Sequence, residues 1–230
     1  YLKGILDKNT IISQFPDRTI QKLIKSPFIS SHNYVDLKGA CKRGIKKTYI
    51  KAKNEYQFLD KGIIDIHHLD KNFIENQIFE NIINICLSIV SKAFPRLNFK
   101  DKFYFNLYVY DNVSTPRCFH RDSLRNRIKC FIPLVEVSEI EEGPLAIYPY
   151  SYKHNLNKII EYISNRIFNS DLGDGINDAC FTSYKKLIPI YYSPGDIVIS
   201  RQDCIHGDCP AKMPFKRSTL VLNIFNNSFL

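Results

Sequence analysis

The most constraining feature of this sequence is a series of short runs between residues 100 and 230 that are rich in β-branched and aromatic residues. The first run, FYFNLYVY at 103–110, alternates strictly, so its two sets of side chains point to opposite faces of a strand. Further runs of this kind lie at 127–135, 144–148, 187–192, 196–200 and 218–225. Gly-Pro, Pro-Gly and single Pro turn signals separate them. Many short strands separated by turns predict a β-barrel or jelly roll.

Two segments show helical rather than alternating periodicity. Apolar residues recur at helical spacing over 72–93, and Pro95 ends that pattern. Leu156, Ile159, Ile160, Ile163 and Ile167 share one helical face in a segment at about 155–188. We therefore expect a single domain over 1–230. Its first 99 residues form a mainly helical support, and residues 100–230 form the β core with a helical or loop insertion at 155–188.

The composition excludes several classes of protein. With 44% hydrophobic and 13% aromatic residues, the chain is too apolar for a disordered protein. No apolar run approaches the roughly 20 residues that span a bilayer. Seven scattered cysteines, an odd number without a C-x-x-C pair, favour reduced thiols and a cytoplasmic location over a disulfide framework. The net charge of +9 favours an anionic partner, although many of these lysines can simply aid solubility.

The chemistry-bearing pattern begins with C-F-H-R-D, in which His120 precedes Asp122 by two positions. In an extended segment the imidazole and the carboxylate point to the same side and can bind one ion. His206 follows the 196–200 run, and a jelly roll brings such remote strands together. Two histidines and one carboxylate make the facial triad of non-haem Fe(II). An H-x-D pair alone is common, and by itself it more often reflects a surface histidine beside a charged neighbour.

Arg217 strengthens this interpretation because it follows His206 by eleven residues, at the start of the last predicted strand. An arginine at the mouth of a barrel, with the Thr219 hydroxyl nearby, is suited to a bidentate grip on a carboxylate. A solvated basic residue at a strand end is the alternative.

In these blocks the sequence resembles the Fe(II)/2-oxoglutarate-dependent dioxygenases of the phytanoyl-CoA dioxygenase type, over about residues 104–225. The resemblance rests on H-R-D at 120–122, IKCFIPLVEVS, EGPLAIYPYSYK at 142–153, SPGDIVIS at 193–200, His206-Gly207 and the step to Arg217. It implies a double-stranded β-helix (a cupin-like jelly roll) in which His120, Asp122 and His206 bind Fe(II). It also implies that Arg217 binds the distal carboxylate of 2-oxoglutarate, with O₂ as the oxidant.

Three positions depart from the family pattern. Lys129 stands where a small polar residue near 2-oxoglutarate is usual, and it either adds a second cation to that site or faces outward. Phe131 stands where Trp is frequent, and Tyr152 replaces a common His. These differences leave the predicted metal site intact and weaken any analogy of substrate. An aspartate at position 122, where halogenating relatives carry a small residue, favours hydroxylation.

Other charged residues have competing interpretations. His67 and His68 could bind a metal, but a loop before the first long helix is the favoured reading. Asp203 and Asp208 flank His206 and either orient it or lie in solvent. A basic cluster follows the metal motif and either binds an anionic group or forms a solvated hairpin; its members are Arg121, Arg125, Arg127 and Lys129.

The sequence therefore predicts an oxygenase that uses Fe(II), 2-oxoglutarate and O₂ to hydroxylate a small, anionic metabolite, such as a sugar or another biosynthetic intermediate. The products of 2-oxoglutarate are succinate and CO₂. The alternative is a non-catalytic jelly-roll module that binds an anionic glycan or nucleic acid. A nucleic-acid demethylase is a weaker alternative, because the basic residues lack an aromatic stacking motif. The oligomeric state is left open.

Overall fold

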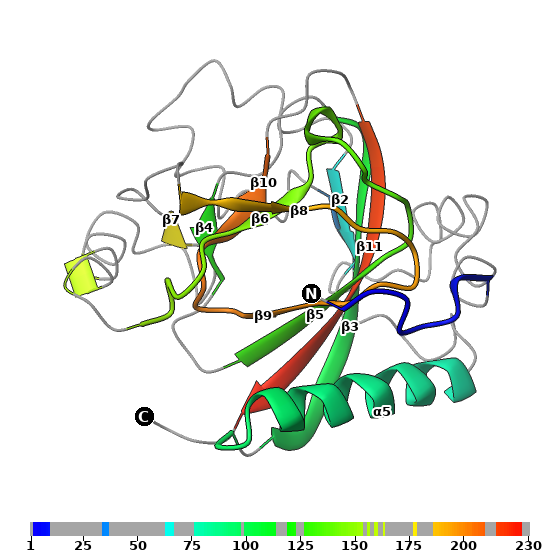
Figure 1. Ribbon diagram of the computed structural model, residues 1–230, viewed down its shortest axis with the longest axis vertical. Coiled ribbons are helices and arrows are strands. Elements are labelled where there is room, and N and C mark those ends of the chain that lie inside the picture. The colour runs from blue at the N-terminus through cyan, green and yellow to red at the C-terminus, as the bar shows by residue number, and fades with distance from the viewer. Residues whose placement is uncertain are drawn as a thin grey trace.

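A computed structural model describes residues 2–9, 34–36, 63–66, 76–97, 99–113, 119–122, 127–153, 156, 159–160, 163, 177–178, 186–209 and 215–226. Two antiparallel β-sheets face each other in this structure, and one long helix packs outside them (Figure 1). Within the described part of the chain, no helix combines the length and the apolar character needed to cross a bilayer.

The larger sheet has six strands in the order β1-β2-β3-β11-β5-β9. Its centre is the long pair β3 and β11. The runs at 103–110 and 218–225 predicted these two strands, and the structure shows that they pair. The strands are β1 (Tyr34–Asp36), β2 (Ile63–Ile66), β3 (Phe99–Val113), β11 (Phe215–Asn226), β5 (Arg127–Pro133) and β9 (Val198–Arg201). Strands far apart in the sequence are neighbours here, as a jelly roll requires.

The smaller sheet has five strands in the order β7-β4-β10-β6-β8, and all of its pairs are antiparallel. The strands are β7 (Asn177–Asp178), β4 (His120–Arg121), β10 (His206–Asp208), β6 (Leu145–Ile147) and β8 (Ile188–Ile190). The short 3-10 helix η2 (Ile140–Glu142) precedes β6. The predicted jelly-roll fold is confirmed by this arrangement of two facing antiparallel sheets.

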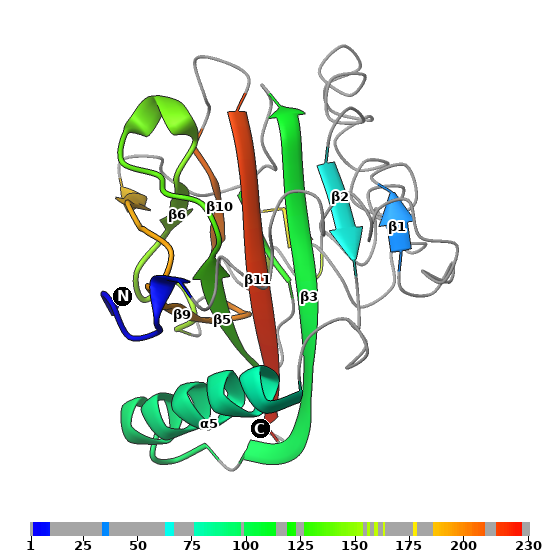
Figure 2. The same ribbon diagram turned by 90° about the vertical axis from the view of Figure 1, so that its right-hand side faces the viewer.

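The helix α5 (Asn76–Ala93) packs against the larger sheet, and Figure 2 shows it at the lower end of β11 and β3. Its buried side chains, among them Phe79, Ile82 and Cys86, pack against the apolar face of β3. The Phe79 and Phe105 rings lie 4.4 Å apart. This contact confirms both the helical periodicity of 72–93 and the apolar face predicted for 103–110.

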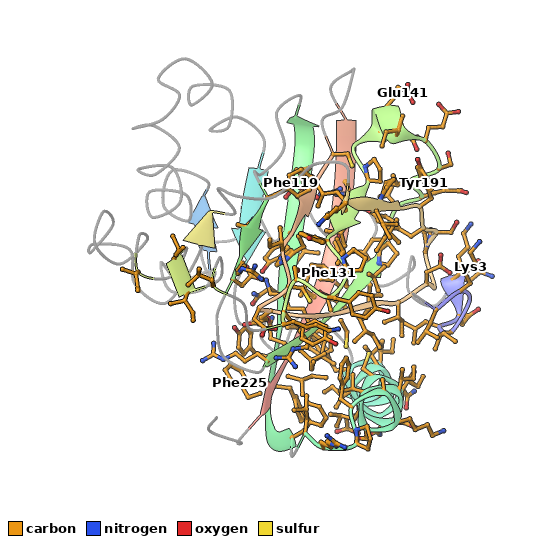
Figure 3. The ribbon with its side chains drawn as sticks, turned by 60° about the vertical axis from the view of Figure 1, so that its left-hand side comes forward. Lys3, Phe119, Phe131, Glu141, Tyr191 and Phe225 are labelled. Atoms are coloured by element: carbon orange, nitrogen blue, oxygen red, sulfur yellow. The ribbon has the colours of Figure 1, made fainter. Side chains whose placement is uncertain are left out.

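A second apolar cluster lies between the two sheets. Phe131 lies near the centre of the molecule, whereas Glu141 and Lys3 lie at its periphery (Figure 3). The members of this inner cluster are Phe131, Val137, Leu145, Tyr192, Val198 and Val221. Four of these residues, Phe131, Leu145, Tyr192 and Val198, also line the pocket described below.

Two regions add to what the sequence predicted. The first 99 residues, expected to be mainly helical, also contribute the strands β1 and β2 to the larger sheet. In the 155–188 insertion, the described residues Leu156, Ile159, Ile160 and Ile163 are helical, as predicted. Their apolar side chains are 41–69% exposed, so this face of the helix is not part of either core cluster.

Candidate active site

Strand pairing in the smaller sheet brings the predicted metal ligands together. His120 on β4 and His206 on β10 are direct cross-strand partners. Asp122 follows β4, where its backbone N–H donates to the carbonyl of Gln202 at 3.1 Å. One potential ligand atom from each of these three side chains lies within 4.8 Å of the other two. A separation of 86 residues in sequence thus becomes one cluster, as the H-x-D pair and the distant histidine predicted.

The two imidazoles are buried and oriented. His120 and His206 are 5% and 4% exposed, and their ring centroids lie 4.7 Å apart. Nδ1 of His206 lies 3.0 Å from the carbonyl oxygen of Cys204. A carbonyl only accepts hydrogen bonds, so Nδ1 is the donor in this contact, and Nε2 is the ring nitrogen that is directed into the cluster. Nε2 faces the Asp122 carboxylate at 3.1 Å, while Nε2 of His120 lies 3.4 Å from its other oxygen.

Lys129 also faces this cluster from β5. Its Nζ lies 2.6 Å from Oδ2 of Asp122 and 3.5 Å from the Tyr108 hydroxyl. It also lies 5.6 Å and 5.9 Å from the ring centroids of Tyr108 and Phe131. Of the two readings of Lys129 left open by the sequence, the structure selects the inward one.

The ion pair between Asp122 and Lys129 keeps both side chains charged. Burial alone would raise the pKa of Asp122, but the positive charge of Lys129, together with His206, holds that pKa well below its usual value. Burial would lower the pKa of Lys129, and the Asp122 carboxylate reverses this effect and raises it. Both groups are therefore charged at neutral pH, and Asp122 is a carboxylate able to bind a cation.

Arg217 is a further buried cation, at 4% exposure. It donates one hydrogen bond to the carbonyl oxygen of Gly143 at 2.6 Å, and its other terminal nitrogen lies 2.5 Å from Oδ1 of Asp208. The guanidinium carbon lies 4.5 Å from the centroid of the Tyr110 ring. Burial would lower the pKa of Arg217, but Asp208 raises it, so the guanidinium keeps its charge.

These groups line one pocket between the sheets. The lining residues include the cluster of His120, Asp122 and His206. Lys129, Arg217, Asp208 and Thr219 also line the pocket. Tyr108 and Tyr110 contribute aromatic surface from β3. The structure therefore brings all six predicted site residues to one cavity. Tyr108 and Tyr110, which lie on the same face of the 103–110 run, also line this pocket.

The residues flanking His206 behave differently from solvated loop carboxylates. Asp203 and Asp208 are 1% and 5% exposed, and each forms an ion pair with an arginine. Asp203 binds Arg201 through both oxygens, at 2.9 Å and 2.8 Å, whereas Asp208 pairs with Arg217. The Asp208–Arg217 contact could not be found from the sequence, because it joins two strands whose relative placement the sequence does not reveal. The Asp203–Arg201 contact is local, since the two residues are two positions apart.

The basic cluster does not act as one surface. Arg121 is buried, and it donates hydrogen bonds to the backbone carbonyls of Ser151 and Asp203, which ties together the two loops beside β10. Arg127 stacks over the Phe225 ring at 4.5 Å, and Lys129 faces the pocket. Arg125, His67 and His68 lie outside the described residues. The solvated-hairpin interpretation is therefore wrong for Arg121 and Lys129.

The donor set fits a divalent metal ion. Two imidazole nitrogens and one carboxylate, converging in a buried pocket, match the ligands of non-haem Fe(II). The contact of Nδ1 with the Cys204 carbonyl orients the His206 ring so that Nε2 is the nitrogen available to a metal. A carboxylate has two oxygens, so Asp122 can keep its contact with Lys129 while it binds an ion.

No protein-family model and no curated protein matches this chain. Solved structures do share its fold. HygX from Streptomyces hygroscopicus, with nickel, 2-oxoglutarate and hygromycin B bound, is 12% identical with a TM-score of 0.59, over 99% of this chain and 82% of that one. The epimerase SnoN, in complex with Fe³⁺, alpha ketoglutarate and nogalamycin RO, is 12% identical with a TM-score of 0.56, over 97% and 77%.

EvdO2 from Micromonospora carbonacea var. aurantiaca, complexed with 2-oxoglutarate, is 17% identical with a TM-score of 0.53. The match covers 71% of this chain and 66% of EvdO2, so the chain spans just under two thirds of that neighbour's length. At these identities the similarity establishes a shared fold. The chain thus has the jelly-roll fold of structures that contain 2-oxoglutarate, and its function has to be argued from its own pocket.

Proposed function

We propose that this chain is an Fe(II)- and 2-oxoglutarate-dependent oxygenase of the phytanoyl-CoA dioxygenase type that hydroxylates a small, anionic metabolite. The observation that carries this proposal is the convergence of His120, Asp122 and His206 in the pocket that also holds Arg217. The presence of 2-oxoglutarate in HygX, SnoN and EvdO2, which share the fold, supports it.

In this proposal the three clustered side chains hold Fe(II). When bound, the metal and 2-oxoglutarate would supply, with O₂, an oxidative decarboxylation in which one oxygen atom enters succinate and the other enters the hydroxylated product, with release of CO₂. The Cys204 carbonyl orients His206 through Nδ1, so that Nε2 faces the metal. Phe131, whose ring lies 5.9 Å from that of His206, shields this side of the site from water.

The pocket offers two cations, Arg217 and Lys129, that would hold the co-substrate. Arg217 binds its distal carboxylate, and Thr219, two residues along the same strand and on the same face, supplies a hydroxyl beside it. Lys129 lies at the metal end of the pocket, where it stabilises the negative charge of the ligand's 2-oxo acid group. Lys129 and Arg217 thus provide hydrogen-bond donors for the two acidic groups of a dicarboxylic co-substrate.

The proposal extends to the substrate, the organisation of the chain and its location in the cell. The substrate is a small molecule, as the hygromycin B and nogalamycin RO in two structural neighbours suggest by analogy. Residues 1–99 support the catalytic core formed by 100–230, into which 155–188 is inserted. The protein acts in the cytoplasm, in accord with free thiols at Cys86, Cys130, Cys204 and Cys209.

An anaerobic titration with Fe(II) and 2-oxoglutarate tests the proposal. We expect a visible metal-to-ligand charge-transfer band that disappears in His120→Ala and weakens in Arg217→Ala. The exposed carboxylate Glu139, changed to Gln, serves as a control that leaves the band unchanged. A wild-type protein that binds no metal, but binds an anionic glycan or nucleic acid in a salt-sensitive manner, would instead support the non-catalytic module.

The substrate class is tested separately by succinate release. Acidic sugars, amino acids and acyl thioesters are offered to the Fe(II)-loaded protein, with uncoupled turnover subtracted. We expect stimulation by acidic sugars or amino acids. A response confined to acyl thioesters would contradict the assignment of a small anionic metabolite.

A further inference from the structure

Asp208 is the charged residue of the pocket that the proposed mechanism does not use. It lies two positions after His206 on β10, and residues at i and i+2 of a strand point to the same face. Its side chain accordingly lines the same pocket as the metal ligands, and it is 5% exposed. A carboxylate buried this deeply requires a partner, and its partner here is Arg217, at 2.5 Å.

This contact changes what Arg217 offers to a ligand. Its guanidinium already has a counter-ion in Asp208 and a second acceptor in the Gly143 carbonyl. A ligand carboxylate that approaches Arg217 also approaches the negative charge of Asp208. In a buried site the repulsion between two carboxylates is screened much less than in water.

The charges that line the pocket show where the attraction for an anion lies. Among the described lining residues, the charged side chains are Lys129, Arg217, Asp122 and Asp208, which sum to 2 − 2 = 0. The Arg217–Asp208 end is neutral as a pair. A divalent ion held by His120, Asp122 and His206 would add its charge at the other end, beside Lys129. The positive potential is thus concentrated at the metal end of the pocket.

We propose that Asp208 is an internal counter-ion that competes with the distal carboxylate of the co-substrate for Arg217. Asp208 thereby reduces the selectivity of the pocket for a dicarboxylic over a monocarboxylic 2-oxo acid. The inference rests on the proposed function, because it assumes that a 2-oxo acid binds in this pocket. Its consequence is that the wild-type protein responds to 2-oxoglutarate only at comparatively high concentration.

The substitution Asp208→Asn tests this inference. Asparagine has the same shape and keeps an acceptor oxygen for Arg217, so it removes the charge while retaining the hydrogen bond. The ligands are 2-oxoglutarate and 2-oxopentanoate, which has the same five-carbon chain but lacks the distal carboxylate. Binding is measured by calorimetry on the full chain loaded with Ni(II), which replaces Fe(II) without turnover.

We expect the Kd of 2-oxoglutarate to fall by roughly tenfold or more in Asp208→Asn, because one buried like charge has been removed. The Kd of 2-oxopentanoate is expected to stay within about twofold, since this ligand has no distal charge to respond. The ratio of affinities is the affinity for 2-oxoglutarate divided by that for 2-oxopentanoate. If Asp208→Asn leaves this ratio unchanged or lowers it, the inference is overturned and Asp208 is a purely structural residue. If neither ligand binds to the wild-type protein, the proposed function itself fails, which is a distinguishable result.

Asp203→Asn provides the matched control. Asp203 is as deeply buried as Asp208, lies on the other side of His206 and pairs with Arg201, but it does not line the pocket. The same loss of charge there is expected to leave the ratio of affinities unchanged. An equal shift in Asp203→Asn would show that the effect is not local to Arg217, which would also overturn the inference.

A second variant covers the case in which Asp208→Asn fails to fold because Arg217 is left without a counter-ion. The double variant Asp208→Asn/Arg217→Gln replaces the buried ion pair by a neutral pair, a change that proteins often tolerate. If Arg217 is neutralised in the wild type, the ratio of affinities in the double variant stays within about tenfold of the wild-type ratio. A larger loss of selectivity for 2-oxoglutarate would show that Arg217 acts as an uncompensated cation.

Discussion

Lys129 offers a direct test of the electrostatics of the pocket, through the substitution Lys129→Met in metal-free protein. Methionine fills a similar volume between the Tyr108 and Phe131 rings but removes the charge that neutralises Asp122. Nζ and Oδ2 are 2.6 Å apart, with 7% and 19% of the two side chains exposed. At an effective dielectric constant of about 20, the attraction at this distance is about 6 kcal/mol.

The net loss of stability is smaller than this attraction, because the variant no longer has to desolvate the Lys129 ammonium. Removing one partner of a buried pair typically costs about 3–5 kcal/mol. Since Asp122 retains some contact with solvent, we expect a decrease of about 3 kcal/mol in the free energy of unfolding. For a chain of this size, that corresponds to a decrease in Tm of roughly 6–12 °C.

The assay is urea denaturation followed by circular dichroism, in chelator and then with Ni(II). A bound divalent ion would neutralise Asp122 in place of Lys129, so Ni(II) should restore more stability to Lys129→Met than to wild type. Lys186→Met removes an exposed lysine and is expected to change stability little in either condition. A Lys129→Met protein that is as stable as wild type in chelator would refute the reasoning.

Two further predictions concern the fold. Leu107→Ala empties a fully buried position between α5 and the larger sheet, and should lower the free energy of unfolding by about 2–5 kcal/mol, measured by guanidinium denaturation. Gly195→Ala should destabilise clearly more than Gly4→Ala in thermal melts. Both glycines have positive φ, but an added Cβ at Gly195 would lie 2.7 Å from the Leu6 carbonyl oxygen, whereas at Gly4 it meets nothing within 4 Å. Equal effects of the two substitutions would show that the contact with Leu6 does not constrain the N-terminal segment.

Much of the fold was predictable because its signals are local. The alternation at 103–110 is a property of adjacent residues, and it placed Phe105 and Leu107 on one face of a strand. The structure shows that this face packs against α5. The periodicity of 72–93 is local in the same sense. The very short strands were harder to predict from the sequence. For example, β10 spans only His206–Asp208, and its extended conformation depends on pairing with β4 and β6.

For the candidate site, the sequence by itself determined which residue types are available and in which order. The spacing of His120 and Asp122 places both on one side of an extended chain, and a resemblance in the order of the blocks linked them to His206 and Arg217. That these residues share one pocket was therefore predictable, and the structure brings them there.

Only the tertiary structure decided how the charges of the pocket are paired. Lys129 could have faced outward, but the register of β5 against β11 and β9 turns it toward Asp122. Asp208 had the pattern of a loop carboxylate, and the approach of β11 to β10 buries it against Arg217. Ion pairs of this kind join residues from different strands, and their energies depend on distance and burial. Both quantities are set by the packing of the two sheets, which no local pattern in the sequence encodes.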